Sequence, residues 1–171
     1  MKLRDSGMPD EDYWESLFDV PLLVERLGIN SAIRDVAEFG CGYGTFTVPI
    51  AQAIRGTLYT FDIEPEMVAR TKQRSKQARV SNVVCRELDV MEHGFDLPSQ
   101  ADAVLLFNIL HCDEPERLMG HAARAVRQNG RVLAIHWRHD PTTPRGPSLD
   151  IRPKPEQLVR WAEHGGQLVR R

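Results

Sequence analysis

The stretch Val36-Ala37-Glu38-Phe39-Gly40-Cys41-Gly42-Tyr43-Gly44-Thr45 decides the fold of this chain. Its first four residues are apolar apart from Glu38, which predicts a short buried strand. The three alternating glycines predict a turn, because glycine tolerates positive φ and lets a ligand approach bare backbone. The apolar residues 46–54 predict a helix, whose N-terminus carries partial positive charge and unpaired N–H groups. The stretch is therefore expected to form a strand, a ligand-binding glycine loop and a helix.

The rest of the chain repeats this alternation of strand and helix. Segments rich in β-branched and apolar residues predict further strands at 57–61, 82–86, 102–107 and 131–137, with a short last strand at 167–170. Helices are expected over 10–18, 21–27, 46–54, 65–79, 113–130 and 156–164. The nearly unbroken apolar run at 102–107 is typical of a central parallel strand that is covered on both faces. The pattern predicts an α/β protein with a doubly wound, mostly parallel sheet and helices on both faces.

Length and charge restrict the function. The chain has 171 residues, a net charge of -2 and three cysteines without a C-x-x-C pair. One domain is expected, with no strong positive field for nucleic acid. The start of the chain has no apolar core of a signal peptide, and no run is long enough to cross a bilayer. We therefore predict a reduced, cytoplasmic protein with no membrane partner, and the charge disfavours nucleic acid as a partner.

The glycine spacing differs from that of a dinucleotide-binding loop. The pattern is G-x-G-x-G, and Glu38 precedes the first glycine by two residues. A carboxylate there would repel a pyrophosphate and suits a cationic ligand. Glu38 to Gly44 resembles the first motif of class I methyltransferases that use S-adenosylmethionine. Phe61 to Met67 is similar to the second motif of that family, and Asn108 to His111 to the end of its fourth strand. The resemblance covers the chain from about Val36 to Trp137.

The resemblance implies a cofactor site at the strand ends, holding S-adenosylmethionine and its product S-adenosylhomocysteine. In this family the first-motif acid and glycines hold the methionine part, the second-strand acid holds the ribose and the acid after the third strand meets the adenine. The positions expected to bind the cofactor are Glu38, Gly40, Gly42, Gly44, Asp62, Ile63, Asp89, Val90 and Asn108. A charged acceptor such as Asp62 can bind both vicinal ribose hydroxyls. The alternatives are that Asp62 only caps the next helix and that Asp89 is only a turn residue.

The candidate bases are His111 and His136, which are both expected near the carboxyl edge of the sheet. Histidine titrates near neutrality and suits proton transfer, although each residue has a purely structural alternative. His136 and His139 have no third ligand at convincing spacing, so no metal is expected. Trp137 either stacks on an acceptor or belongs to the core.

The acceptor leaves few marks in the sequence. Phe107-Asn108-Ile109-Leu110 occupies the place where adenine-N6 and glutamine methyltransferases carry an Asn/Asp-Pro-Pro-Tyr/Phe tetrapeptide. Together with the mild acidity, this favours a small-molecule acceptor, with protein and RNA as open alternatives. A non-catalytic module of the same fold and a nicotinamide-dependent oxidoreductase are the competing hypotheses.

The two ends of the chain carry further expectations. Residues 1–30 are expected to form a helical segment that packs on the sheet or covers the cofactor with Tyr13 or Trp14, and 31–171 to form the cofactor-binding domain. The family's sheet normally ends with a sixth strand and an antiparallel seventh strand. This C-terminal hairpin is expected to be incomplete here, which leaves the fifth strand as an edge. A homodimer through that edge is the partner hypothesis.

Overall fold

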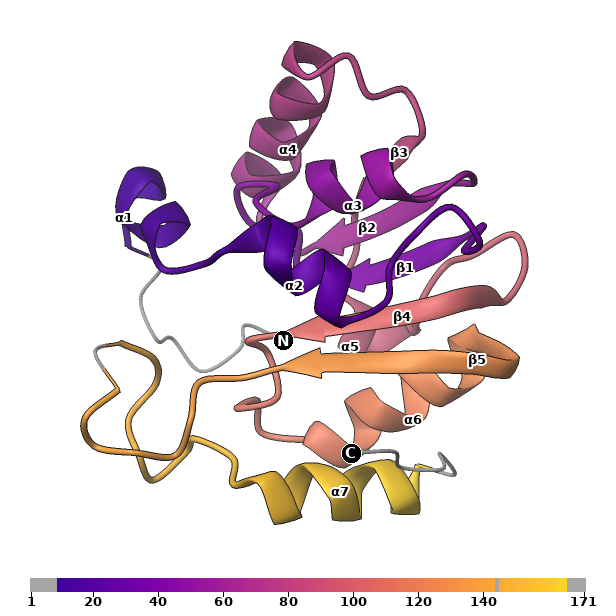
Figure 1. Ribbon diagram of the computed structural model, residues 1–171. Helices are drawn as coiled ribbons and strands as arrows, with labels where there is room; N and C mark the ends of the chain where they lie inside the picture. The colour runs from indigo at the N-terminus through magenta and orange to yellow at the C-terminus, as the bar shows by residue number, and fades with distance from the viewer. Residues whose placement is uncertain (1–8, 144, 166–171) are drawn as a thin grey trace.

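The computed structural model describes residues 9–143 and 145–165 and contains a five-stranded sheet in which all neighbouring strands are parallel (Figure 1). The strands lie in the order β3-β2-β1-β4-β5. Their bounds are β1 Val36–Phe39, β2 Leu58–Asp62, β3 Val83–Glu87, β4 Ala101–Phe107 and β5 Val126–Ile135. The chain winds outward in one direction from β1 and in the other from β4. The predicted doubly wound α/β class is confirmed, and ligands in such sheets bind where the winding reverses, beyond the carboxyl ends of the strands.

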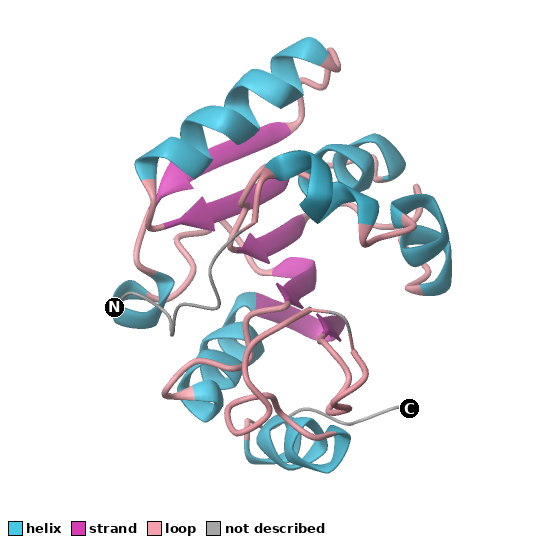
Figure 2. Cartoon of the chain, turned by 90° about the vertical axis from the view of Figure 1, so that its left-hand side faces the viewer, coloured by secondary structure: helices cyan, strands magenta, loops and turns pink. Residues whose placement is uncertain are grey.

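Helices cover both faces of this sheet (Figure 1). The bounds are α1 Glu11–Ser16, α2 Val20–Arg26, α3 Thr47–Ala53, α4 Pro65–Gln77, α5 Val90–His93, α6 Pro115–Ala125 and α7 Pro155–His164. Helix α3 packs against α2 and α4 on one face, and α6 packs against α5 and α7 on the other. Helix α1 lies at the edge of the sheet where the strands have their carboxyl ends (Figure 1). Figure 2 shows the molecule viewed from that edge. No helix in the described part of the chain is long and apolar enough to span a membrane.

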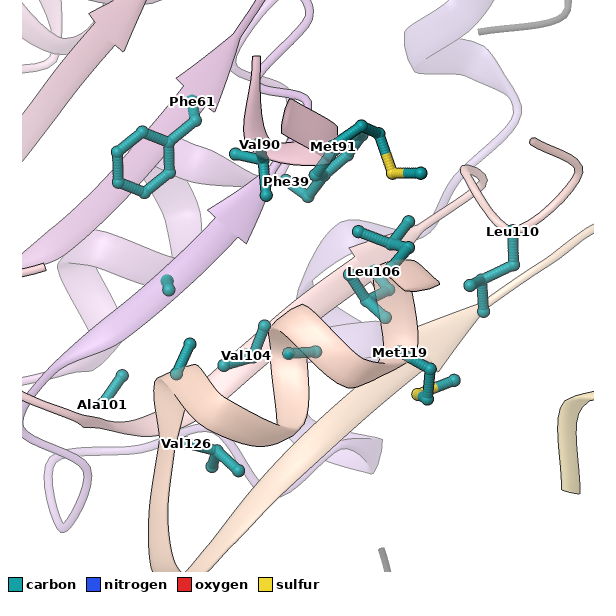
Figure 3. Close-up of a cluster of buried hydrophobic side chains, with 14 of the residues drawn as sticks. Phe39, Phe61, Val90, Met91, Ala101, Val104, Leu106, Leu110, Met119 and Val126 are labelled. Atoms are coloured by element: carbon teal, nitrogen blue, oxygen red, sulfur yellow. The ribbon is translucent and has the colours of Figure 1, made fainter. Parts of the chain in front are cut away.

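The two cores explain the unbroken apolar sequence of β4. Val104 and Leu106 face a cluster that includes Met119 of α6, as Figure 3 shows. Leu105 and Phe107 belong to a second cluster on the side of α2 and α3. Because successive side chains of a strand point to opposite faces, a strand between two helical layers needs apolar residues at every position. The expectation for residues 102–107 is confirmed.

The boundary between α6 and β5 corrects the sequence prediction. The helix was expected to continue to Asn129-Gly130, but it ends at Ala125, and Val126 already pairs with Ala101 in the sheet. The register then shifts, and Asn129 adopts a φ of 63°. A Cβ on Gly130 would lie 2.5 Å from Cγ2 of Val126, so the glycine permits a tight bulge inside the strand. Sheet pairing of Val126 therefore overrides the usual meaning of Asn-Gly as a helix stop.

Strand β5 is the outer strand beyond β4, and the sheet is not closed. The short strand expected at residues 167–170 lies outside the described residues.

Candidate active site

The glycine loop joins β1 to α3 at the point where the winding of the sheet reverses. Gly40, Gly42 and Gly44 all have positive φ, with values of 78°, 49° and 76°. The hydroxyl of Thr71 in α4 donates to the carbonyl of Gly42 at 2.9 Å. A Cβ on Gly44 would lie 3.1 Å from the same hydroxyl, so the loop and α4 approach closely there. The loop is therefore a tight backbone turn that is held in place from α4.

Glu38 lies beneath this loop and is almost fully buried. Its Oε2 accepts hydrogen bonds from the hydroxyls of Thr47 at 2.6 Å and Thr60 at 2.7 Å. Burial raises the pKa of Glu38 to about 7, and the nearby charge of Asp62 adds to this, while the two hydroxyls oppose it. The side chain thus joins β1, β2 and α3 under the loop. Binding of the methionine part by Glu38 and the glycines stays a prediction.

Asp62, at the end of β2, holds the loop from the other side. Its Oδ2 accepts from the N–H of Gly42 at 3.0 Å, and its Oδ1 accepts from the N–H of Glu64 at 3.0 Å. A carboxylate has about four acceptor positions, so these two bonds leave capacity for ribose hydroxyls. Ile63 is half-buried beside it. Asp62 therefore has a structural role in holding the loop, and its binding of the ribose stays a prediction.

Asp89 and Val90 form the start of α5, a helix that the sequence analysis did not predict. Oδ1 of Asp89 accepts from the N–H groups of Met91 at 2.9 Å and Glu92 at 3.3 Å, which is the geometry of an N-cap. Val90 is buried, with 1% of its surface exposed. A helix of four residues gives no periodic signal, so only the capping pattern of Asp89 could have indicated it. Contacts of this pair with adenine stay a prediction.

Asn108, at the end of β4, is the most unusual residue of the site. Its φ is 54°, and its N–H donates to the carbonyl of Ile135 at 2.7 Å. Its buried Nδ2 has no hydrogen-bond partner among the described residues. The side chain of the next residue, Ile109, lies 3.7 Å from a Cβ built on Gly40, so the end of β4 lies next to the glycine loop. A buried unsatisfied donor costs about 1–3 kcal/mol, and a bound polar ligand removes that cost. The residues present therefore fit a polar cofactor.

His111 and His136 follow β4 and β5, and the structure brings them into contact. Nδ1 of His111 lies 3.3 Å from Nε2 of His136, with the two rings at 74° to each other. Nδ1 of His136 lies 3.3 Å from the carbonyl oxygen of Trp137. The pKa of His136 is lowered to about 4, mainly by burial and also by the charges of His111 and Arg152, while the hydrogen bond to the carbonyl of Trp137 opposes this. The sequence predicted that both rings lie at this edge but gave no sign that they touch.

The segment 136–154, called here the carboxyl-edge loop, is organised around a residue that the sequence analysis missed. Arg152 is 7% exposed, and its guanidinium donates to three backbone carbonyls. Nη2 lies 2.6 Å from the carbonyl oxygen of Pro147, and Nη1 lies 2.9 Å from that of Arg138 and 3.2 Å from that of Asp140. The planar guanidinium group has five N–H donors and can therefore bind several carbonyls at once. An arginine in a proline-rich segment is an ordinary surface residue by pattern, so no signal in the sequence distinguishes it.

Helix α1 is attached to α4, and Pro9 just before it contacts the glycine loop. Glu11 pairs with Arg70 of α4 at 2.8 Å, and Glu15 pairs with Arg74. The hydroxyl of Tyr43 donates to the carbonyl of Pro9 at 2.8 Å. Arg70 and Arg74 therefore attach α1 to α4. The role of residues 1–30 as a lid over the cofactor stays a prediction.

Trp137 belongs to an aromatic cluster between α1 and the carboxyl-edge loop. Its ring centroid lies 6.2 Å from that of Trp14 and 5.6 Å from that of Phe18. A Cβ on Gly146 would lie 2.6 Å from Cγ of Trp137, so the loop folds directly onto the indole.

Within residues 9–143 and 145–165, no group of three or more potential metal ligands gathers. The expectation that no metal is needed stays a prediction.

Comparison with known sequences places residues 37–132 in a family model described as "Methyltransferase domain". The chain is 28% identical over 111 residues to the tRNA (adenine(58)-N(1))-methyltransferase catalytic subunit TRM61 of Yarrowia lipolytica, covering 63% of this chain and 28% of that protein. It is 24% identical over 115 residues to the malonyl-[acyl-carrier protein] O-methyltransferase of a Paenibacillus species, covering 65% of this chain and 42% of that protein. The chain thus matches less than half the length of either relative.

Solved structures with the same fold include a S-adenosylmethionine-dependent methyltransferase from Aquifex aeolicus. It has a TM-score of 0.82 at 20% identity, covering 95% of this chain and 86% of that one. Magnesium protoporphyrin IX methyltransferase from Synechocystis, solved with S-adenosylhomocysteine bound, has a TM-score of 0.68 at 17% identity, covering 96% and 80%. Both similarities concern the fold.

Proposed function

We propose that this chain, which belongs to the methyltransferase domain family, transfers a methyl group from S-adenosylmethionine to a small-molecule acceptor. The predicted resemblance to class I methyltransferases is confirmed at the level of family and fold. The activity itself is our proposal, because the relatives by sequence extend well beyond the matched region.

The observation that carries the proposal is the meeting of three features at one point of the sheet. These are the glycine loop with its positive φ angles, the carboxylate of Asp62 bound to that loop, and, at the neighbouring end of β4, the buried amide nitrogen of Asn108, which has no partner among the described residues. Each feature has a structural explanation alone. Together they form a backbone cradle, a charged acceptor and an unsatisfied donor at the reversal point where such sheets bind ligands.

The residues of the site mainly provide orientation. S-adenosylmethionine, when bound, supplies an electrophilic methyl group on a sulfonium. The glycine loop would hold the methionine part, Asp62 the ribose, and Asp89 with Val90 the adenine, while Asn108 Nδ2 would donate to a polar group of the cofactor. Good orientation of two reactants is worth roughly 7–11 kcal/mol of a reaction barrier. His111 and His136 are the candidate bases for an acceptor that must lose a proton.

The mild net charge of -2 favours a small-molecule acceptor over RNA, which proteins usually meet with a positive surface. One relative is named for a tRNA and another for a carrier-bound malonyl group, so the relatives themselves are named for different acceptors.

A dimer through the open edge of β5 and a cytoplasmic location are further predictions. A monomer in light scattering at high micromolar concentration would contradict the dimer.

The proposal is tested by calorimetric titration of the chain with S-adenosylmethionine, S-adenosylhomocysteine and NADH. We expect micromolar binding of the first two and none of NADH. Binding of NADH alone would establish the oxidoreductase hypothesis instead. A screen of small acceptors and total RNA, read out as S-adenosylhomocysteine formed, then separates a catalyst from a non-catalytic module.

Asp62→Ala gives the residue-level test. We expect it to weaken S-adenosylmethionine binding by about 1.5–3 kcal/mol, because hydrogen bonds to a charged acceptor are lost. Asp96→Ala is the matched control, since Asp96 is an exposed partner of Arg86 outside the site. Unchanged affinity in a folded Asp62→Ala protein would mean that the ribose lies elsewhere.

A further inference from the structure

A cavity of about 600 Å³ lies between the carboxyl-edge loop and the first turns of α7, and it is called here the Arg152 cavity. The loop leads from the carboxyl end of β5 to α7 (Figure 1). The volume is in the range of about 300–1,000 Å³ that small-molecule sites have, although most such sites have a largely apolar lining. The ionisable side chains that line this cavity are those of His139, Asp150, Arg152, Lys154, Glu156 and Arg160. A lining of this kind indicates a charged ligand.

Arg152 is the buried cation of the lining. Its side chain has five N–H donors, and the residue is 7% exposed. Four of the donors bind backbone carbonyls. Nε lies 3.1 Å and Nη2 lies 2.6 Å from the carbonyl oxygen of Pro147, and Nη1 binds the carbonyls of Arg138 and Asp140. One N–H of Nη2 therefore has no partner in the described contacts.

No carboxylate forms an ion pair with Arg152 in the described part of the chain. Its bonds all go to carbonyls, which carry only partial charge. The carboxylate of Asp140 instead accepts from the N–H and the hydroxyl of Thr142, at 2.8 Å and 2.7 Å. Besides the burial of His136 and the hydrogen bonds of Thr142 to Asp140, the charge of Arg152 lowers the pKa of both groups, so it still acts on its surroundings. Buried charges in proteins are normally paired, so this guanidinium indicates an anionic partner.

Two exposed cations complete the lining. Lys154 and Arg160 are exposed, and neither makes an ion pair with a described residue. Of the two carboxylates, Glu156 lies in the first turn of α7, where the helix N-terminus favours an acid, and Asp150 already has a partner. Three permanent cations therefore line the cavity with two carboxylates, which leaves an excess of positive charge.

We propose that the Arg152 cavity binds the oxyanion group of a small molecule, a phosphate or a carboxylate, with Arg152 at its buried side and Lys154 and Arg160 at its exposed side. The guanidinium fork matches the oxygen atoms of both groups, and Lys154 adds a point charge. None of the lining residues belongs to the candidate cofactor site, so this proposal does not depend on the proposed methyl transfer.

The first test is calorimetric titration of the full chain with inorganic pyrophosphate and with citrate at constant ionic strength. We expect saturable binding with a Kd below about 1 mM for at least one probe. Tighter binding of pyrophosphate indicates a phosphate group in the natural ligand, and tighter binding of citrate indicates carboxylates. No saturable binding of either probe up to about 10 mM would overturn the proposal.

Backbone 1H–15N spectra recorded during the titration show where the probe binds. We expect the largest shifts at residues 149–157. Shifts confined to residues 40–44 would overturn the proposal, because the anion would then lie at the glycine loop.

A pair of double variants tests the residues. Arg152 is left in place because the carboxyl-edge loop depends on it. In Lys154→Gln with Arg160→Gln, we expect the Kd of the bound probe to rise about tenfold, because two cations of the site are lost. Lys72→Gln with Lys76→Gln removes the same charge from the exposed side of α4 and is the matched control, with an unchanged Kd.

Equal binding by the two double variants would overturn the proposal, and if the first variant fails to fold, the shifts of the wild-type chain decide. A chain that binds a probe in this cavity but does not bind S-adenosylmethionine contradicts the proposed function and supports the anion site.

Discussion

Two segments flank the carboxyl edge of the sheet, and they are held in opposite ways. Helix α1 is attached through ion pairs of Glu11 and Glu15 with arginines of α4, and these side chains are about a quarter to a third exposed. The carboxyl-edge loop is attached through the buried guanidinium of Arg152, which binds only backbone carbonyls in the described contacts. Both segments meet at Trp137, whose ring lies against Trp14 of α1 and Gly146 of the loop.

The difference indicates which segment can move. Exposed ion pairs are worth about 0–1 kcal/mol each and are screened by salt. The guanidinium of Arg152 makes four hydrogen bonds to backbone carbonyls, and hydrogen bonds to a charged group are worth about 1.5–3 kcal/mol each. We therefore expect α1 to open readily over the glycine loop, while the carboxyl-edge loop stays a fixed wall of the site.

The largest expected effect comes from replacing Arg152, the side chain that holds the carboxyl-edge loop. Arg152→Leu should lower the stability of the carboxyl-edge loop by about 3–5 kcal/mol, because four hydrogen bonds from a charged donor are lost and the carbonyl of Pro147 keeps no other donor in the described contacts. Hydrogen exchange of residues 138–152, read by mass spectrometry, should become fast while β1 and β4 stay protected. Arg160→Leu, on the exposed side of α7, is the control. Unchanged protection in Arg152→Leu would show that the prolines alone hold the loop.

A pH titration should separate the two segments. The folded pKa of His136 is lowered to about 4 from about 6.5, so the unfolded chain binds more protons between these values. The contribution of His136 to stability is fully present above pH 6.5 and is lost as the pH falls through the folded value, by about 3 kcal/mol at pH 4 from about 1.4 kcal/mol per pKa unit. His136→Gln should remove this loss, and His164→Gln should not.

The attachment of α1 should respond in a different pH range. Hydrogen bonding to Arg70 lowers the pKa of Glu11, so this contact persists above pH 4.5 and weakens only as the pH falls through the lowered value. The hydrogen-exchange protection factors of residues 11–16 should therefore stay constant between pH 6.5 and 4.5, whereas those of the carboxyl-edge loop next to His136 should already fall in this range. Simultaneous loosening of both segments in that range would contradict separate attachment.

The smallest expected effect is on α1 itself. Arg74→Ala removes contacts with Glu11 and Glu15 and should cost less than about 1 kcal/mol of global stability. It should nevertheless increase proteolytic cleavage near residues 9–18, and 0.5 M salt should have the same effect on the wild type. Arg117→Ala, which removes a surface pair with Glu114, is the matched control. Equal cleavage of both variants would show that aromatic packing, not charge, holds α1.

Several features of the fold could be predicted because they depend on local sequence. The local sequence determines the backbone conformation in three places: the apolar run of β4, the glycine loop, and the first turns of helices that contain proline. The end of α6 was mistaken because Asn129-Gly130 usually stops a helix, whereas here pairing of Val126 with Ala101 starts the strand earlier. Helix α5 was missed because four residues are too few for a periodic pattern.

By itself, the sequence determined the α/β class, the order of the elements and the placing of Glu38, Asp62, Asn108, His111 and His136 at strand ends. Those properties follow from periodicity and turn chemistry within a few residues. Only the tertiary structure decided that Glu38 accepts from two threonines under the loop, that the amide nitrogen of Asn108 has no partner in the described part of the chain, and that the two histidines touch. It also decided that Arg152 is a buried centre and not a surface residue. Such contacts join segments far apart in the chain, and their existence depends on packing, which no local pattern encodes.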